Sequence, residues 1–221
     1  MEFKTFTIFG ERCSGTNYLQ QLVETNFHIT YRWTPYKHFY CSNDFLNIFE
    51  EPNEFYLIIL RDPIDWINSF YQSPHHLGSE NRESIHSFLT KPMISYFEMG
   101  PLKGEIIPFE KNPYTNSFFK DIFELREVKN YFYVKQIPLL TPHSIWIRYE
   151  DLKENPDYIL QKIQNHFQLK TKFPFYQKVE YYKDKKEEKY IPKEKILSEE
   201  DEMYIKSYLN IEQEMQLGYL K

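Results

Sequence analysis

The sequence has no alanine, and it contains only two cysteines, six glycines and six arginines among its 221 residues. The two cysteines, Cys13 and Cys41, are too few for a disulfide framework or for a zinc site built from several thiolates. No stretch approaches the roughly eighteen consecutive apolar residues of a membrane span. The start, MEFKTFTIFG, has no cationic segment followed by a long apolar one, so we expect no secretory signal. These absences predict a cytoplasmic protein that does not span a membrane.

The chain also lacks an excess of positive charge. Its formal net charge is −5, whereas proteins whose main task is to bind nucleic acid carry a basic surface. Hydrophobic residues at 41% and charged residues at 27% are ordinary values for a globular protein, and a chain of this length can bury one full-sized core. We therefore expect a single domain over residues 1–221 and no nucleic-acid partner. Phe, Tyr, Ile, Asn and Lys are abundant, as in AT-rich coding, so the scarce glycines and arginines are the most informative positions.

Strand-like and helix-like patterns alternate along the chain. Short apolar runs predict strands, and apolar residues at helical spacing predict helices. The expected strands are 5–9, 55–60 and 144–148; the expected helices are 16–27, one starting at Pro63, 156–167 and one from Ser198, with weaker helices near 84–98 and 115–130. This alternation predicts an α/β fold with a central, mainly parallel sheet flanked by helices. Ligands of such sheets bind beyond the carboxyl ends of the strands.

The segment Gly10–Leu19, GERCSGTNYL, joins the first strand to the first helix. Its glycines flank a short turn, and a helix N-terminus attracts phosphate or sulfate through its unpaired N–H groups and its dipole. Ser14, Thr16 and Asn17 add hydroxyl and amide donors. The spacing of nucleoside triphosphatases requires a lysine after the second glycine, whereas Gly15 is followed by Thr16. The pattern therefore predicts a phosphate-binding strand–loop–helix and disfavours a metal-dependent triphosphatase.

Two further strand ends extend this pattern. Arg61 stands at the end of the second strand, with Ser69 eight residues later on the following helix, and Arg148–Leu152, RYEDL, follows the third strand. Together with the Ser-Gly-Thr of the first loop, these segments resemble the signatures of the sulfotransferase family that uses 3′-phosphoadenosine 5′-phosphosulfate (PAPS). The three segments occur in the family's order and span residues 8–152.

The resemblance implies transfer of a sulfuryl group from PAPS to a hydroxyl or amine of a small-molecule or glycan acceptor, leaving adenosine 3′,5′-bisphosphate (PAP), without a metal. It also implies the residues that bind the donor. Arg61 and Ser69 would hold the 3′-phosphate, and the 5′-phosphosulfate would be held by Arg12, Cys13, Ser14, Gly15, Thr16 and Asn17.

One position departs from the family pattern. The family places a catalytic Lys or Arg immediately before Ser-Gly, and Cys13, which carries no positive charge, occupies that position. Either Arg12 or Lys37 would then supply the cation. His38 lies at the spacing where several branches of the family place a catalytic base, and its ordinary pKa near 6.5 suits proton removal at neutral pH.

Other interpretations stay open at this point. The same strand–loop–helix could belong to a metal-dependent nucleotide or nucleoside kinase, or to a nucleotide-binding module without activity. Glu150 and Asp151 could bind substrate or cap a helix, Arg126 and Lys129 form a basic pair, and Lys185 or Lys186 in the Lys/Glu-rich loop 181–195 could touch the 3′-phosphate. The acceptor and the oligomeric state are not specified by any of these patterns.

Overall fold

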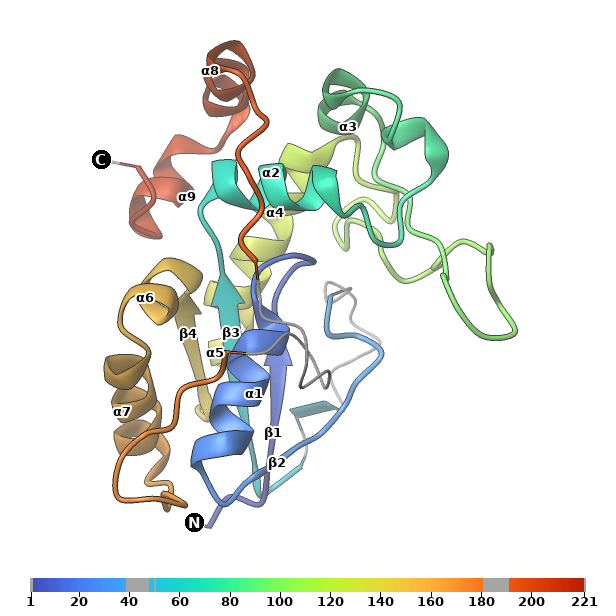
Figure 1. Ribbon diagram of the computed structural model, residues 1–221. Coiled ribbons are helices and arrows are strands. Elements are labelled where there is room, and N and C mark those ends of the chain that lie inside the picture. The colour runs from blue at the N-terminus through green and yellow to red at the C-terminus, as the bar shows by residue number, and fades with distance from the viewer. Residues whose placement is uncertain (1, 39–47, 50, 181–190, 221) are drawn as a thin grey trace. The chain divides into compact units, whose positions relative to one another are not determined.

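The computed structural model of the chain describes residues 2–38, 48–49, 51–180 and 191–220 (Figure 1). The chain divides into two compact units. Unit 1 comprises Met1–His38, Leu46–Arg61 and Tyr133–Pro192, and unit 2 comprises Phe39–Phe45, Asp62–Phe132 and Lys193–Lys221. The prediction of one domain over residues 1–221 is therefore not confirmed.

Unit 1 is built on a four-stranded, wholly parallel sheet with the strand order β2-β1-β3-β4. Its strands are β1 (Thr5–Phe9), β2 (Thr30–Tyr31), β3 (Glu54–Leu60) and β4 (Ser144–Arg148). All residues of β3 are buried, as expected for a central parallel strand covered on both faces. The helices of unit 1 are α1 (Thr16–Asn26), α5 (Ile137–Leu140), α6 (Tyr149–Glu154) and α7 (Pro156–Phe167). The α/β class and the flanked parallel sheet are confirmed.

The strand order places a topological switch point between β1 and β3. These two strands are neighbours, but the chain continues from β1 through α1 to β2 on one side, and β4 adds to β3 on the other side. The two connections therefore diverge at the carboxyl ends of β1 and β3. In open parallel sheets, this divergence leaves a crevice where ligands bind.

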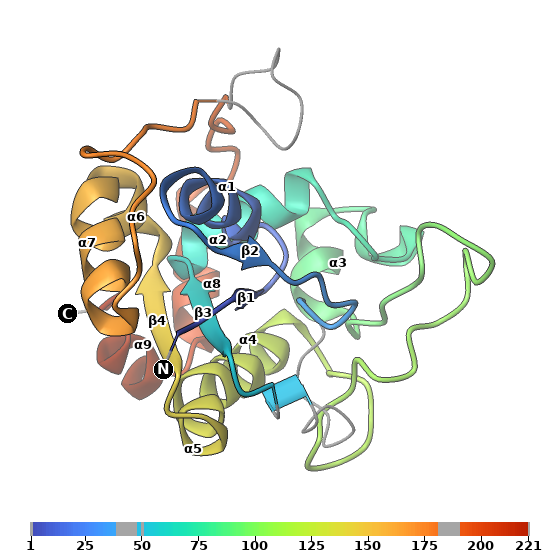
Figure 2. The same cartoon turned by 90° about the horizontal axis from the view of Figure 1, so that it is seen from below.

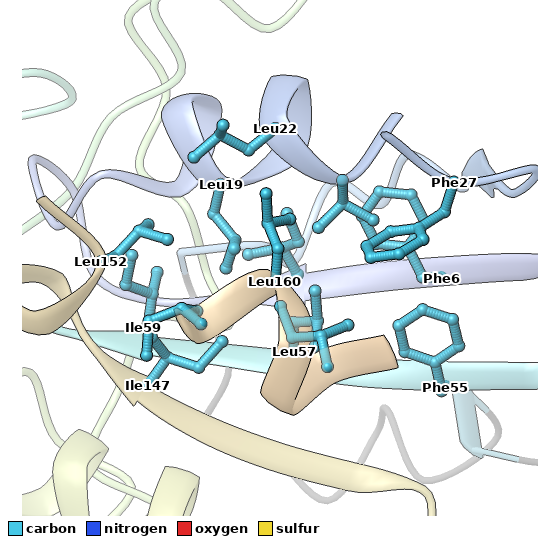
Figure 3. Close-up of a cluster of buried hydrophobic side chains, with 14 of the residues drawn as sticks. Phe6, Leu19, Leu22, Phe27, Phe55, Leu57, Ile59, Ile147, Leu152 and Leu160 are labelled. Carbon is cyan, nitrogen blue, oxygen red and sulfur yellow. The ribbon is translucent and has the colours of Figure 1, made fainter. Parts of the chain in front are cut away.

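An apolar cluster covers one face of this sheet. Side chains of β1, β3 and β4 meet side chains of α1, α6 and α7, among them Phe6, Leu57, Leu19 and Leu160 (Figure 3). Helix α5 contacts β4 from the opposite side of the sheet (Figure 2). Because α1 is fixed to the sheet along its length, its N-terminus is held beside the end of β1.

Unit 2 is helical, and its helices are α2, α3, α4, α8 and α9 with a short 3₁₀ turn, η2. Their bounds are α2 (Pro63–Gln72), η2 (Ser79–Asn81), α3 (Ile85–Thr90), α4 (Ile122–Tyr131), α8 (Glu199–Tyr208) and α9 (Ile211–Gln216). Two buried ion pairs stabilise the unit. Both Arg126 Nε and Nη2 donate to Glu214, at 2.6 and 2.8 Å, and Lys129 Nζ donates to Glu110.

The two weaker helix predictions were too long. Helix α3 ends at Thr90, since Pro92 follows and a proline disfavours helical backbone in the residue before it. Helix α4 begins only after Asp121, whose carboxylate accepts a hydrogen bond from Glu124 N. Beyond Tyr131 the chain continues as a π-helical stretch, η3 (Phe132–Gln136), which the sequence did not indicate. Within the described ranges, no helix is both long and apolar enough to cross a membrane.

Candidate phosphate-binding site

The loop between β1 and α1 has an unusual backbone. Ser14 N donates to Glu11 O at 3.1 Å, which closes a tight turn, and Cys13 has a φ of 63°. Gly15, the residue before α1, has a φ of 92°. Left-handed backbone costs a residue with a side chain roughly 1–2 kcal/mol, so the conformation of Cys13 is held by its surroundings.

The glycines of this loop are required by close contacts. A Cβ at Gly10 would lie 2.6 Å from Ile59 O, and a Cβ at Gly15 would lie 2.4 Å from Tyr149 Cδ2. The loop is thus tightly packed against β3 and against the start of α6. Gly15 is constrained twice, by its positive φ and by the tyrosine ring.

Helix α1 begins without a cap. Among the described residues, no side chain of the cap position accepts a hydrogen bond from its first turn, and that turn contains no acidic residue. Unpaired N–H groups at a helix start carry partial positive charge and favour an anion. The predicted donors Ser14 and Thr16 are both buried there, and Asn17 is partly buried.

Lys37 and His38 are bound to this loop. Gly10 N donates to Lys37 O at 3.2 Å, and His38 Nδ1 lies 2.7 Å from Gly10 O. Lys37 Nζ donates to Asn17 Oδ1 at 2.8 Å and lies 5.8 Å from the centre of the Tyr31 ring. Lys37 is 9% exposed. An ammonium group is therefore held at the first turn of α1.

The state of His38 follows from its surroundings. Burial, with the nearby Lys37 charge as the second cause, lowers the pKa of His38 to about 3. The imidazole is therefore neutral at pH 7. Because the Gly10 carbonyl can only accept, Nδ1 carries the proton and Nε2 carries the lone pair. The ring is thus set in the tautomer that can take up a proton at Nε2.

Arg12 has a different environment. It is 1% exposed, and its Nε donates to Glu11 Oε1 at 2.7 Å; the same carboxylate oxygen accepts from Arg12 N. The charge of Arg12 is therefore balanced by a buried neighbour. The sequence left open a surface ion pair of Arg12 with Glu11 or another acid as the alternative to a role in the site. The structure shows the pair with Glu11, and it is buried.

Arg61, directly after β3, is joined to the same loop. Arg61 Nη1 donates to Cys13 O at 2.9 Å, and its guanidinium carbon lies 4.7 Å from the centre of the Tyr149 ring. Arg61 Nε is buried and has no hydrogen-bond partner among the described residues. An unpaired buried donor is costly, so this atom marks a place where an acceptor would stabilise the site.

Ser69, the predicted partner of Arg61, lies in unit 2. It is a buried residue in the second half of α2, a helix capped by Asp62, whose side chain accepts from Ile64 N and Asp65 N. Its joint role with Arg61 stays a prediction.

The other candidate residues lie in helix starts or in buried ion pairs, or they are outside the residues that the structure describes. Glu150 and Asp151 occupy the first turn of α6, and the next helix, α7, is capped by Asn155. Arg126 and Lys129 are buried in ion pairs, so they are not an exposed basic pair. Lys185, Lys186 and Cys41 lie outside the described residues. Within the described ranges, no cluster of three or more His, Cys, Asp or Glu residues could hold a metal ion.

The amino-acid sequence was also compared with known proteins. A scan against protein-family models found no match, and a search of curated proteins found none. The functional interpretation therefore depends on the residues themselves.

Proposed function

We propose that this protein is a PAPS-dependent sulfotransferase whose donor site lies at the carboxyl ends of β1 and β3. One observation carries the proposal. The uncapped start of α1, the Lys37 ammonium group and the Arg61 guanidinium all meet one short loop at the topological switch point. Three independent sources of positive potential in an acidic protein favour a polyanionic ligand.

The loop would hold the 5′-phosphosulfate of the donor. The N–H groups of Gly15, Thr16 and Asn17 lie at the start of α1, where an anion is stabilised by hydrogen bonds and by the helix dipole. The hydroxyls of Ser14 and Thr16 add donors. Cys13 contributes its backbone, since its carbonyl oxygen holds Arg61.

Lys37 is the better candidate for the catalytic cation that Cys13 cannot supply. Its amine lies 2.8 Å from Asn17 Oδ1, at the helix start, whereas the Nε of Arg12 is paired with Glu11. Arg12 would then support the loop through its ion pair. Negative charge that develops on the sulfuryl oxygens and on the leaving phosphate would be stabilised by Lys37.

His38 would act as the base. The acceptor oxygen or nitrogen attacks sulfur as the bond from sulfur to the phosphate oxygen of PAPS breaks, and PAP leaves with that electron pair. The acceptor proton passes to Nε2 of His38. A pKa of about 3 makes a weak base, but the several negative charges of a bound donor would raise the pKa of His38.

Arg61 would bind the 3′-phosphate. With Nη1 used by Cys13 O, the edge formed by Nε and Nη2 is the one that can bind phosphate through two parallel hydrogen bonds. This assignment predicts that Arg61→Ala weakens PAP more than it weakens 5′-AMP. The acceptor would be a hydroxyl or amine on a small molecule or glycan.

Calorimetric titration of the full chain with PAP tests the proposal. We expect saturable, stoichiometric binding, followed by sulfuryl transfer when PAPS and a panel of acceptors are supplied. No binding at millimolar PAP to a folded sample would overturn it. PAP binding without transfer to any acceptor would instead favour a nucleotide-binding module, and turnover of ATP with magnesium would favour a kinase.

A further inference from the structure

We propose that Tyr149 is a positioning residue that fixes the orientation of Arg61 and thereby sets the preference of the site for a 3′-phosphate. This inference rests on the proposed function. Tyr149 itself need not touch the donor, because it would act through the arginine it contacts.

The contact is specific in its geometry. The guanidinium carbon of Arg61 lies 4.7 Å from the centre of the Tyr149 ring, within the range of a cation–π interaction. Tyr149 is 7% exposed and is the first residue of α6, which follows β4 directly. The ring is therefore held by the core of unit 1, and it provides a fixed surface for an otherwise flexible side chain.

A second contact restricts the rotation of the Arg61 guanidinium group. Nη1 donates to Cys13 O at 2.9 Å, on one side of the group. The contact with the ring and this hydrogen bond restrict the guanidinium group from two sides. The Nε–Nη2 edge is then set in one orientation, and Nε is buried with no partner among the described residues. Such an edge matches two oxygens of one phosphate.

The Tyr149 ring also lies against Gly15, in the loop between β1 and α1. A Cβ on Gly15 would lie 2.4 Å from Tyr149 Cδ2 and 2.7 Å from Cε2. Tyr149, which follows β4, thus contacts both Gly15 in the loop after β1 and Arg61 directly after β3. Its contact with Gly15 would affect the 5′-phosphate, which PAP and 5′-AMP share, whereas its contact with Arg61 would affect only the 3′-phosphate. The two roles can be separated by comparing these ligands.

The test measures the affinities of PAP and 5′-AMP for the wild-type chain and for Tyr149→Leu and Tyr149→Phe. Leucine removes the ring, so we expect the ratio of the two affinities to fall by about threefold to tenfold, the range of a cation–π contact. Phenylalanine keeps the ring and removes the hydroxyl, so the ratio should stay within about twofold of the wild type. Losses in the loop or in overall folding would weaken both ligands equally and leave the ratio unchanged.

A double variant identifies Arg61 as the intermediary. In Arg61→Ala the 3′-phosphate preference is already lost, so adding Tyr149→Leu should not lower the ratio further. An unchanged ratio in Tyr149→Leu, or an independent loss in the double variant, would overturn the inference while leaving the proposed function intact. Failure of the wild-type chain to bind PAP at all would instead contradict the proposed function.

Discussion

Helices α1 and α2 both begin shortly after a buried parallel strand, but their first turns differ. Helix α2 has Asp62 as its cap, Pro63 in its first turn and the acidic Asp65 close behind, so its own side chains satisfy and neutralise its start. Helix α1 has Gly15 in place of a cap, and its first turn contains no acid.

The two helix starts differ in whether side chains of the chain itself bind their N–H groups. The N–H groups of α2 are occupied by the chain itself, as they are in α7, where Asn155 accepts from Tyr158 N. The start of α1 has no side-chain cap, and Cys13 and Gly15 before it have left-handed backbone. Under the proposed function, the N–H groups of this helix start bind an external anion. Lys37 contacts Asn17 in the first turn of α1, and Arg61 contacts Cys13 in the loop before that helix.

The strongest test of the comparison is Gly15→Ala. The substitution combines a positive φ with a Cβ 2.4 Å from the Tyr149 ring, so we expect the loop to move and PAP binding to be lost. The free energy of unfolding should fall by about 2–4 kcal/mol, more than the roughly 1–2 kcal/mol of the backbone conformation alone.

Gly100→Ala is the matched control for that variant. Gly100 has a φ of 80°, and a Cβ added there would meet no atom within 4 Å, so the variant carries the backbone cost without the overlap. Thermal unfolding and PAP titration of both variants separate the two contributions. Retained PAP affinity in Gly15→Ala would contradict the account of the loop.

Lys37→Ala should reduce sulfuryl transfer by about 10²–10³-fold, the usual effect of removing one group that stabilises transition-state charge. The double variant Lys37→Ala with Cys13→Lys moves the cation to the family's position, and we expect it to regain part of the rate. Single-turnover rates measure both. A Lys37→Ala enzyme with unchanged rate would assign the cation to another residue.

Asn17→Asp makes the start of α1 resemble that of α2. The new carboxylate is isosteric, pairs with Lys37 and repels the donor, so PAP affinity should fall by about tenfold. Asn155→Asp adds the same charge at the start of α7 and should leave PAP affinity unchanged. Equal losses in the two variants would show that only net charge matters.

The last prediction concerns the dependence of stability on pH. The pKa of His38 is lowered from 6.5 to about 3, so the unfolded chain binds more protons between these values. The stability contributed by His38 is complete above pH 6.5 and is lost as the pH falls towards 3, with a slope of at most about 1.4 kcal/mol per pH unit. Denaturant titrations at several pH values should show that the free energy of unfolding of His38→Gln falls less steeply with decreasing pH than that of the wild type. An identical decline in the variant would contradict the lowered pKa of His38.

Local sequence rules predicted much of the fold. The bounds of β1, β4 and α7 follow from apolar runs with clear starts and stops, and Ser198 caps α8 as expected from its position. The two-residue strand β2 has no pattern of its own, because pairing with β1 defines it. The division into two units depends on packing over long sequence distances, which local periodicity does not report.

Only part of the candidate site could be predicted from the sequence. Gly15 and Arg61 stood out because both residue types are rare in this chain. Tyr149 was named only as part of the RYEDL segment, because it is one of 19 tyrosines and its role depends on a contact with Arg61 at the end of the neighbouring strand. The choice between Arg12 and Lys37 likewise depended on the Glu11 ion pair and the Asn17 hydrogen bond, which only the folded chain shows.

Titration of the isotope-labelled protein with PAP, monitored through the NMR chemical shifts of its backbone amides, tests whether the start of α1 binds the donor. We predict the largest shifts at Gly15, Thr16 and Asn17, at the uncapped start of α1, and little change at Tyr158, at the capped start of α7. Saturable binding with unshifted amides at the start of α1 would contradict the account.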